Sequence, residues 1–130
     1  MVSKALSVLL VDDNQDTRDM LGLLFEEWGY SATLVSNATE GLKQLLARGF
    51  DIIILDNWLP DLDGVELCRQ IREFNRHTPI IFFSAATMGS EDRAALAAGA
   101  NAYLNKGGGL GGLREAMAVE LKKTNPQAGD

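Results

Sequence analysis

Residues 8–13 read Val-Leu-Leu-Val-Asp-Asp, a short run of apolar side chains that ends in two carboxylates. The same pattern returns at residues 52–56, which read Ile-Ile-Ile-Leu-Asp. An apolar run without alternation is typical of a strand that is covered on both faces, as in a parallel sheet flanked by helices. The two stretches therefore predict buried parallel strands that end in acidic residues.

Three more apolar runs complete a predicted set of five strands. They lie at residues 33–35, 80–83 and 102–104. The segments between and after the runs have helical spacing, so strand and helix alternate along the chain. Right-handed crossovers return each strand to the same direction. The sequence thus predicts an α/β fold with one doubly wound parallel sheet of five strands, each followed by a helix.

The helices are predicted from apolar stripes and end signals. The stripes are Thr17, Met20, Leu21, Leu24, Phe25 and Trp28, then Leu42, Leu45 and Leu46, then Leu67, Ile71 and Phe74. We expect Asn37 to cap the second helix, which stops near Gly49. The fourth is expected at 90–98, with Ser90 as its cap and Gly99 as its stop. The fifth is expected at 113–123.

Composition restricts the class of protein. The chain has 130 residues, 46% of them hydrophobic, which suits one globular domain. We assign residues 1–123 to this domain and 124–130 to a polar tail or the start of a linker. The net charge of −6 and the lack of a Lys/Arg cluster argue against direct nucleic-acid binding. No apolar run reaches transmembrane or signal-peptide length, so we expect a cytoplasmic protein that does not bind membranes.

Five polar residues follow the predicted strands and should meet at one edge of the sheet. They are Asp12, Asp13, Asp56, Ser84 and Lys106. Ligands of such folds bind at the carboxyl ends of the strands. Three neighbouring carboxylates repel one another unless a cation is present, and Mg²⁺ favours oxygen ligands. The lysine and the serine supply a charge and a hydroxyl for phosphoryl oxygens.

Each of these residues also has a plain structural explanation. Asp13 or Asn14, for example, would serve as the cap of the first helix. The single cysteine, Cys68, cannot form an internal disulfide and is interpreted as a small buried thiol. The placement of all five polar residues at one edge favours the functional interpretation over separate structural roles.

With these motifs in place, the chain resembles the receiver domain family of response regulators from about residue 6 to residue 119. The resemblance rests on residues 8–13, 52–56, 59–64 (Leu-Pro-Asp-Leu-Asp-Gly), 80–85 and 103–106 (Tyr-Leu-Asn-Lys). It implies a flavodoxin-like strand order of 2-1-3-4-5. It also implies a phosphoacceptor of a two-component phosphorelay rather than an enzyme with external substrates. Such a domain catalyses only its own phosphorylation and dephosphorylation.

The resemblance assigns a role to each site residue. Asp56 becomes the phosphoacceptor, and Asp12, Asp13, Asp56 and the backbone carbonyl of Trp58 become the Mg²⁺ ligands, with Asp12 acting through water.

Ser84 and Lys106 bind phosphoryl oxygens, and Tyr103 turns inward when Ser84 moves. The resulting switch repacks the face of the fourth helix, fifth strand and fifth helix. As a strand residue, Tyr103 is equally interpreted as a half-buried aromatic.

The implied partners are a histidine kinase or a histidine phosphotransfer protein as donor, and a downstream protein that the sequence does not identify. The sequence leaves open whether phosphorylation drives dimerisation. It also leaves open whether this is a stand-alone receiver or part of a longer protein, because no output domain follows.

Two departures from the family pattern stand out. Lys106 is usually followed by proline, but here residues 107–112 read Gly-Gly-Gly-Leu-Gly-Gly, which predicts a mobile loop and a less firmly held lysine. Trp58 and Ala86 occupy positions that tune phosphate hydrolysis in the family. A bulky ring beside the site hinders water and alanine cannot position it, so we expect slow self-dephosphorylation.

Three other functions are compatible with an α/β fold of this kind. A flavodoxin-like cofactor binder does not need an acidic cluster, because flavin phosphate prefers amide and hydroxyl donors. A phosphatase with an Asp nucleophile needs a second Asp two positions later, where this chain has Trp58. A degenerate receiver that only binds partners is disfavoured by the complete set of site residues, although the glycine-rich segment keeps it open.

Overall fold

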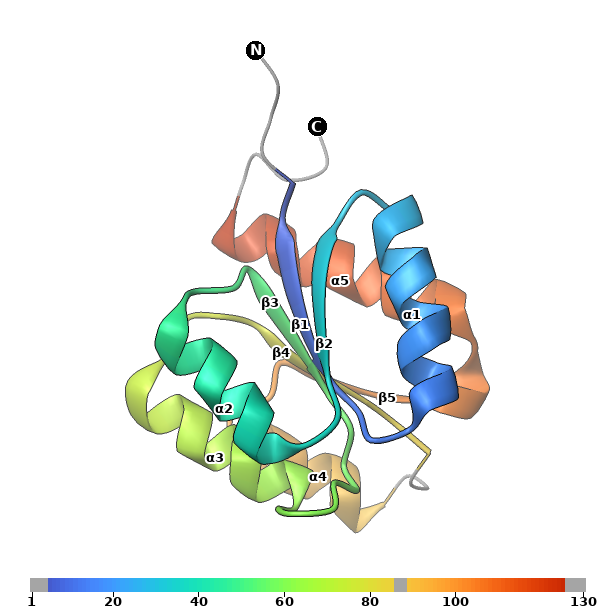
Figure 1. Cartoon of the computed structure of the whole chain (residues 1–130). Helices are drawn as coiled ribbons and strands as arrows, with labels where there is room; N and C mark the ends of the chain where they lie inside the picture. Colours follow the sequence, from blue (N-terminus) through green and yellow to red (C-terminus); the bar gives the residue numbers. More distant parts are fainter. Residues whose placement is uncertain (1–4, 86–88, 126–130) are drawn as a thin grey trace.

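Five parallel strands form one sheet in the order β2-β1-β3-β4-β5 (Figure 1). The computed structural model describes residues 5–85 and 89–125. The strands are β1 Ser7–Val11, β2 Ser31–Val35, β3 Ile52–Leu55, β4 Ile80–Ser84 and β5 Ala102–Asn105. The central strands pair in register, with Leu10 beside Ile54 and Ile54 beside Ile81. The predicted fold and strand order are confirmed.

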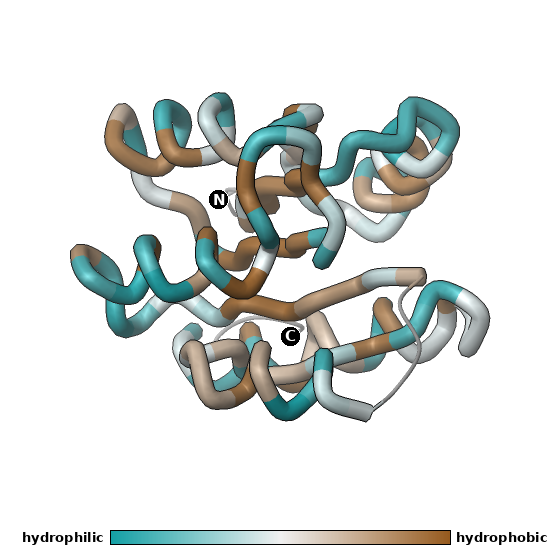
Figure 2. Tube along the Cα trace, turned by 90° about the horizontal axis from the view of Figure 1, so that it is seen from below, coloured by the Kyte–Doolittle hydropathy of each residue, from teal (hydrophilic) through white to brown (hydrophobic). Residues whose placement is uncertain are grey.

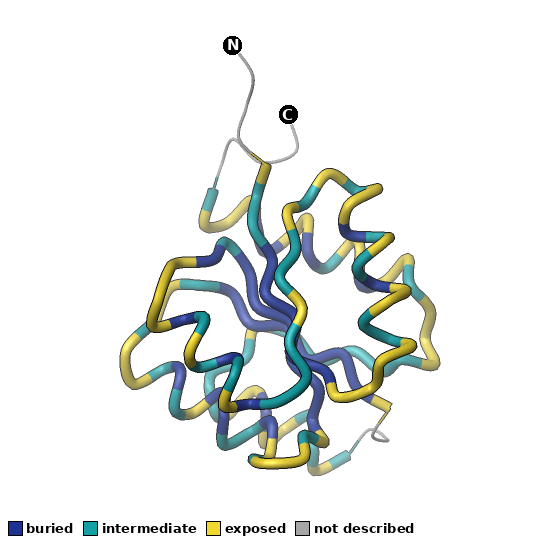
Figure 3. Tube along the Cα trace, in the orientation of Figure 1, coloured by how far each residue is buried: buried dark blue, intermediate teal, exposed yellow. Residues whose placement is uncertain are grey.

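Side chains of the strands alternate between two apolar cores, one on each face of the sheet. Leu9, Ile53 and Phe82 belong to the core under α2, α3 and α4. Leu10 and Ile54 belong to the core under α1 and α5. All four residues of β3 are completely buried, and Figure 3 shows the buried sheet between partly exposed helices. The continuous apolar runs are therefore explained by cover on both faces.

The five helices are α1 Gln15–Glu27, α2 Ala38–Ala47, α3 Gly64–Phe74, α4 Ser90–Ala97 and α5 Leu110–Thr124. Three of them begin at a side-chain cap. Asn14 accepts from the Thr17 amide, Asn37 from the Glu40 amide and Asp63 from the Val65 amide. These contacts satisfy amide groups that have no partner inside the helix. The prediction of Asn37 as a cap is confirmed.

The structure corrects the prediction for the start of α4. Ser90 is the first helical residue, and the cap position belongs to Gly89, with φ of 143°. A positive φ of this size suits glycine, which has no Cβ. The predicted N-cap of α4 is therefore wrong by one residue.

Three predicted members of the apolar stripes are exposed. Leu46 is 73% exposed, Phe74 47% and Met20 41%. In α2 the buried face is set by Ala38, Gly41 and Leu45, which are spaced by three and four residues, and Leu46 lies about 100° further around the helix. Figure 2 shows the hydrophobic segments concentrated in the middle layer of the molecule and polar segments on the outer helices (Figure 2).

Less of the glycine-rich segment is loop than expected, because α5 begins three residues before the predicted start at residue 113. Residues Lys106–Gly108 form a 3₁₀ turn, Gly109 has φ of 96°, and α5 begins at Leu110. Gly111 and Gly112 are thus helical, although glycine costs about 1 kcal/mol in a helix. Burial of Leu113 and the residues one and two turns further along α5 offsets this cost.

The end of α5 agrees with the predicted limit of the domain to within one residue. Thr124 is the last helical residue, and Asn125 follows as the C-cap. The remainder of the predicted tail, residues 126–130, lies outside the described residues. The division into domain and tail stays a prediction.

An arginine that the sequence did not single out ties α3 to the far edge of the sheet. Arg72 donates to the carbonyls of Gly99, Asn75 and Thr78 and to the side chain of Asn101. Four acceptors from two connecting loops are thereby satisfied by one guanidinium. Nearby, Cys68 is completely buried, and this burial raises the pKa of its thiol to about 11. The prediction of a small buried thiol is confirmed.

Gly64 allows the start of α3 to contact the chain that follows β3. Its amide donates to the carbonyl of Asn57 over 2.9 Å. A Cβ at this position would lie 2.2 Å from the backbone oxygen of Asp56 and 2.9 Å from Cα of Asn57. Because these neighbours are backbone atoms, they cannot rotate away. Glycine is therefore required at position 64, because a larger residue would clash with the backbone after β3.

We predict that Gly64→Ala lowers the free energy of unfolding by about 3 kcal/mol, the upper range for overpacking. Gly112→Ala is the matched control, because no atom lies within 4 Å of its added Cβ. It should raise the free energy of unfolding by about 1 kcal/mol. Urea unfolding of both variants measures the two effects. A Gly64→Ala variant as stable as the native chain contradicts the prediction.

Candidate functional site

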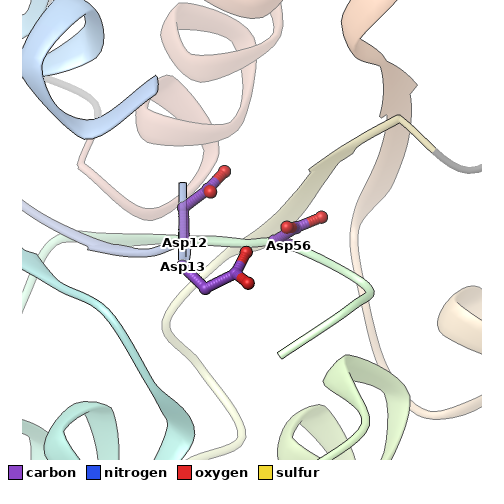
Figure 4. A group of neighbouring side chains, drawn as sticks. All are labelled: Asp12, Asp13 and Asp56. Carbon is purple, nitrogen blue, oxygen red and sulfur yellow. The ribbon is translucent and has the colours of Figure 1, made fainter. Parts of the chain in front are cut away.

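The polar residues predicted from the sequence meet at the carboxyl ends of four strands. Asp12 follows β1, Asp56 follows β3, Ser84 ends β4, and Lys106 follows β5. Figure 4 shows the carboxylates of Asp12, Asp13 and Asp56 grouped where β1 and β3 end (Figure 4). The expected convergence at one edge is therefore present in the structure.

The three aspartates offer ligand atoms within a small space. One carboxylate oxygen from each of Asp12, Asp13 and Asp56 lies within 4.8 Å of the others. Asp12 and Asp56 are buried and Asp13 is exposed, so one side of the group is open to solvent. Burial raises the pKa of Asp56, and the neighbouring charge of Asp12 raises it further, while Lys106 and hydrogen bonds lower it. Ionisation of Asp56 is thus opposed by its surroundings.

Lys106 is the cation that faces this group. Its Nζ lies 2.9 Å from Oδ2 of Asp12 and 3.8 Å from Oδ2 of Asp56. The other carboxylate oxygen of Asp56, Oδ1, accepts no hydrogen bond within the described part of the chain. One ammonium does not balance three carboxylates. A buried carboxylate oxygen without a donor and a surplus of negative charge fit a hard divalent cation such as Mg²⁺.

Backbone contacts hold Asp12 and Asp56 in position. The Asp56 amide donates to the carbonyl of Val11 over 3.0 Å, which extends the pairing of β1 and β3. The Asn14 amide donates to Oδ1 of Asp12, and the guanidinium of Arg18 donates to the Asp12 carbonyl. Arg18 was not found by sequence reasoning, because its role depends on the first turn of α1 returning over the end of β1.

Ser84 lies beside the backbone that follows Asp56. Its Oγ accepts from the Asn57 amide over 3.4 Å, and the Ser84 hydroxyl lowers the pKa of Asp56. The Asn57 carbonyl in turn accepts from Gly64. A movement at Asp56 can therefore reach both β4 and α3 through the backbone of one residue, Asn57.

Tyr103 is half-buried on β5, and its ring stacks on Phe82 with centroids 5.7 Å apart. Its hydroxyl oxygen is buried and makes no well-formed hydrogen bond within the described residues. Burial raises the pKa of Tyr103, and the nearby Ser84 hydroxyl offsets part of this. The ring thus packs against Phe82, with its hydroxyl near that of Ser84. This position fits both a switch residue and a half-buried aromatic of the strand.

The loop that follows β3 also caps α2. Asp61 accepts from the amides of Ala38 and Thr39 and from the Thr39 hydroxyl, at 2.7–2.9 Å. Burial acts to raise the pKa of Asp61, but these hydrogen bonds outweigh it and lower the pKa. This role of the Leu-Pro-Asp-Leu-Asp-Gly motif was missed, because Asp61 and its partners are more than 20 residues apart.

Of the two residues expected to tune the site, the structure describes only Trp58. The side chain of Trp58 is 57% exposed, and its carbonyl as a metal ligand stays a prediction. Ala86 lies outside the described residues.

Comparison with known proteins gives the class of this chain. A model of the response regulator receiver domain matches residues 8–118. Solved structures agree over nearly the whole chain. The receiver domain of Francisella response regulator 1452 has a TM-score of 0.86 at 28% identity, covering 92% of this chain and 99% of that one. A receiver domain protein from Methanospirillum hungatei JF-1 reaches 0.89 at 25% identity, covering 96% and 100%. The chain belongs to the receiver domain family of two-component response regulators.

Among curated proteins, the chain is 36% identical over 122 residues to response regulator MprA of Mycobacterium sp. (strain KMS). The alignment covers 94% of this chain and 53% of that protein. MprA of Mycobacterium avium (strain 104) is 36% identical over 120 residues, covering 92% and 53%. The chain thus spans about half the length of the curated relatives it matches. In its described part, no helix is both long and apolar enough to cross a membrane.

We predict that Asp56→Asn raises the free energy of unfolding of the metal-free protein at pH 7. The expected increase is about 1 kcal/mol, a typical size for the effect of a single substitution. The folded pKa of Asp56 is raised, so between the unfolded and the folded pKa the folded state keeps a proton that the unfolded state has lost. Stability therefore falls as pH rises from the unfolded to the folded pKa of Asp56. The asparagine removes this loss, and the advantage should vanish below both pKa values.

Asp61→Asn is the matched control with the opposite sign. Its folded pKa is lowered, so the native carboxylate stabilises the fold above its unfolded pKa and the variant should melt earlier at pH 7. Thermal melts of the two variants at pH 3 and pH 7 measure both effects. Reduced stability of Asp56→Asn at pH 7 contradicts the account of the acidic cluster.

Proposed function

We propose that Asp56 accepts a phosphoryl group from a phosphohistidine donor and that Mg²⁺ is bound during the transfer. The observation that carries this proposal is the grouping of three carboxylates within 4.8 Å beside Lys106, at the strand ends of a receiver fold. No other arrangement among the described residues combines a buried acceptor carboxylate, a cation site and a lysine.

The transfer is a substitution at phosphorus. A carboxylate oxygen of Asp56 attacks the phosphorus atom, the P–N bond to the donor imidazole breaks, and its electron pair leaves on the imidazole nitrogen. The product on this chain is an acyl phosphate. Lys106, with Nζ 3.8 Å from Oδ2 of Asp56, and the hydroxyl of Ser84 contact the phosphoryl oxygens as charge develops on them.

The metal ligands in this proposal are Asp12, Asp13, Asp56 and the backbone carbonyl of Trp58. All are oxygen donors, which Mg²⁺ prefers. The exposed side of Asp13 leaves room for water ligands, including the one through which Asp12 acts. Bound Mg²⁺ supplies positive charge that neutralises the carboxylates and the phosphoryl oxygens. Removal of the metal should therefore prevent the transfer.

The phosphorylated site is read out at the face formed by α4, β5 and α5. Ser84 moves toward the new phosphoryl group, and Tyr103, two residues before the partner of Ser84 on β5, follows because its hydroxyl lies near that of Ser84. The pairing of Ser84 with Asn105 in the β4–β5 ladder supports this path, because it ties the two strand ends together. The repacked face then binds a downstream protein or a second copy of the chain.

The proposed partners follow from this chemistry. A histidine kinase or a histidine phosphotransfer protein supplies the phosphoryl group, and the chain acts on no external substrate beyond this donor. It catalyses its own phosphorylation and dephosphorylation. Residues 1–123 form the receiver domain, and residues 124–130 are a tail or the start of a linker.

We predict that incubation with acetyl phosphate adds one phosphoryl group to the native chain in the presence of Mg²⁺ and none in the presence of EDTA. Asp56→Ala should gain none under either condition, because it lacks the acceptor. Intact-mass measurement detects the change. Asp19→Ala, which removes an exposed carboxylate from α1, is the control and should behave like the native chain.

If the folded native chain binds Mg²⁺ but gains no mass, the proposal is wrong. The degenerate receiver, a binding module that works without phosphate, then becomes the better account. A gain of mass that persists in Asp56→Ala would instead assign the acceptor to another residue.

We also propose that Trp58 slows hydrolysis of the acyl phosphate by hindering the attacking water. Trp58→Ala should shorten the lifetime of the phosphorylated chain severalfold. The loss of the added mass after removal of the donor measures this lifetime. Trp28→Ala controls for loss of an indole elsewhere. A lifetime in Trp58→Ala equal to or longer than the native one contradicts the hypothesis.

A further inference from the structure

A groove that the proposed phosphoryl transfer does not use lies between the first turns of α3 and α4. Its volume is about 450 Å³, within the range of sites that take small ligands. Its wall includes Asn57, Trp58, Asp63, Glu66, Arg69 and Glu91. The groove thus begins at the residue directly after Asp56.

The charge of the groove is negative. Asp63, Glu66 and Glu91 supply three carboxylates, and Arg69 supplies one guanidinium that is already paired with Glu66 over 2.7 Å. Acidic residues in first turns also stabilise helices by themselves. They set the sign of the ligand that the groove accepts, but they do not show that a ligand binds.

Asn57 provides the independent indication of a ligand. Asn57 lines the groove and is only 2% exposed, and its side-chain oxygen Oδ1 accepts no hydrogen bond from any described residue. The backbone of Asn57 is already bonded, to Ser84 through the amide and to Gly64 through the carbonyl. An acceptor left unpaired in this way is unfavourable, because burial has removed the water that would otherwise donate to it. A ligand that brings an N–H donor into the groove removes this cost.

The donor is selected by the indole of Trp58, which is 57% exposed at the same groove. A guanidinium carries five N–H donors in a plane and stacks on aromatic rings better than the compact, strongly hydrated ammonium of lysine. An anion is disfavoured, because the carboxylates repel it. The first amides of α3 are also occupied, since Gly64 donates to Asn57 and Val65 donates to Asp63.

We propose that this groove binds the guanidinium group of an arginine side chain on a partner protein. An N–H of the guanidinium donates to Oδ1 of Asn57, its plane lies on Trp58, and Glu91 and Asp63 balance its charge. The contact does not require phosphorylation of Asp56, so it is a second recognition element beyond the proposed phosphoryl transfer.

The test is an NMR titration of the full, metal-free chain without any phosphodonor. The probe is N-acetyl-arginine methylamide, and the matched probe is the citrulline analogue, which has nearly the same shape but no charge. The resonances of the Trp58 indole N–H and the Asn57 side-chain amide should shift and saturate with the arginine probe, at a Kd of about 1 mM. The citrulline probe should bind at least tenfold more weakly.

Variants locate the effect. Glu91→Gln should weaken binding of the arginine probe severalfold, and Asn57→Ala should weaken it about tenfold. Glu73→Gln, an exposed residue near the other end of α3, should leave it unchanged. Absence of shifts, equal shifts from the two probes, or native affinity in Glu91→Gln would overturn the proposal. Because no phosphoryl group is present, each of these results is separate from the outcome for Asp56.

Discussion

The pairing of β1 with β3 is the constraint on which the site depends. Val11 lies beside Leu55 in the parallel ladder, and the next residue along each strand is an aspartate. The hydrogen bond from the Asp56 amide to the Val11 carbonyl extends this register past the end of β3. Two carboxylates that would otherwise move apart are thereby held together. The burial of apolar strands on both faces stabilises the sheet and outweighs the repulsion between the carboxylates.

Contacts in several parts of the structure hold the two carboxylates in this arrangement. Lys106 reaches the acidic group from the end of β5 and offsets part of the repulsion. The absence of a side chain at Gly64 lets α3 contact the chain after Asp56 directly. At the opposite edge of the sheet, Arg72 joins the end of α3 to the segments before β4 and β5. A preorganised cluster of like charges is typical of a site that binds a cation and an anion together.

Most of the fold could be predicted because its signals are local. Continuous apolar runs predicted the strands, and Asn37 predicted the start of α2. The wrong predictions were displaced by one residue. Leu45, and not Leu46, lies on the buried face of α2, and Gly89, and not Ser90, is the N-cap of α4. The glycine-rich segment misled because its helical part is stabilised by Leu113 and by later residues of α5 that pack against the sheet, and propensity alone does not include that packing.

The sequence by itself determined the order of the elements and the presence of Asp12, Asp13, Asp56, Ser84 and Lys106 at strand ends. These follow from periodicity and from the shared direction of parallel strands. Tertiary structure alone decided that Asp61 caps α2, that Arg72 binds four acceptors and that Oδ1 of Asn57 is left without a donor. Such facts depend on distances between residues far apart in the chain, and only the packing of helices on the sheet sets those distances.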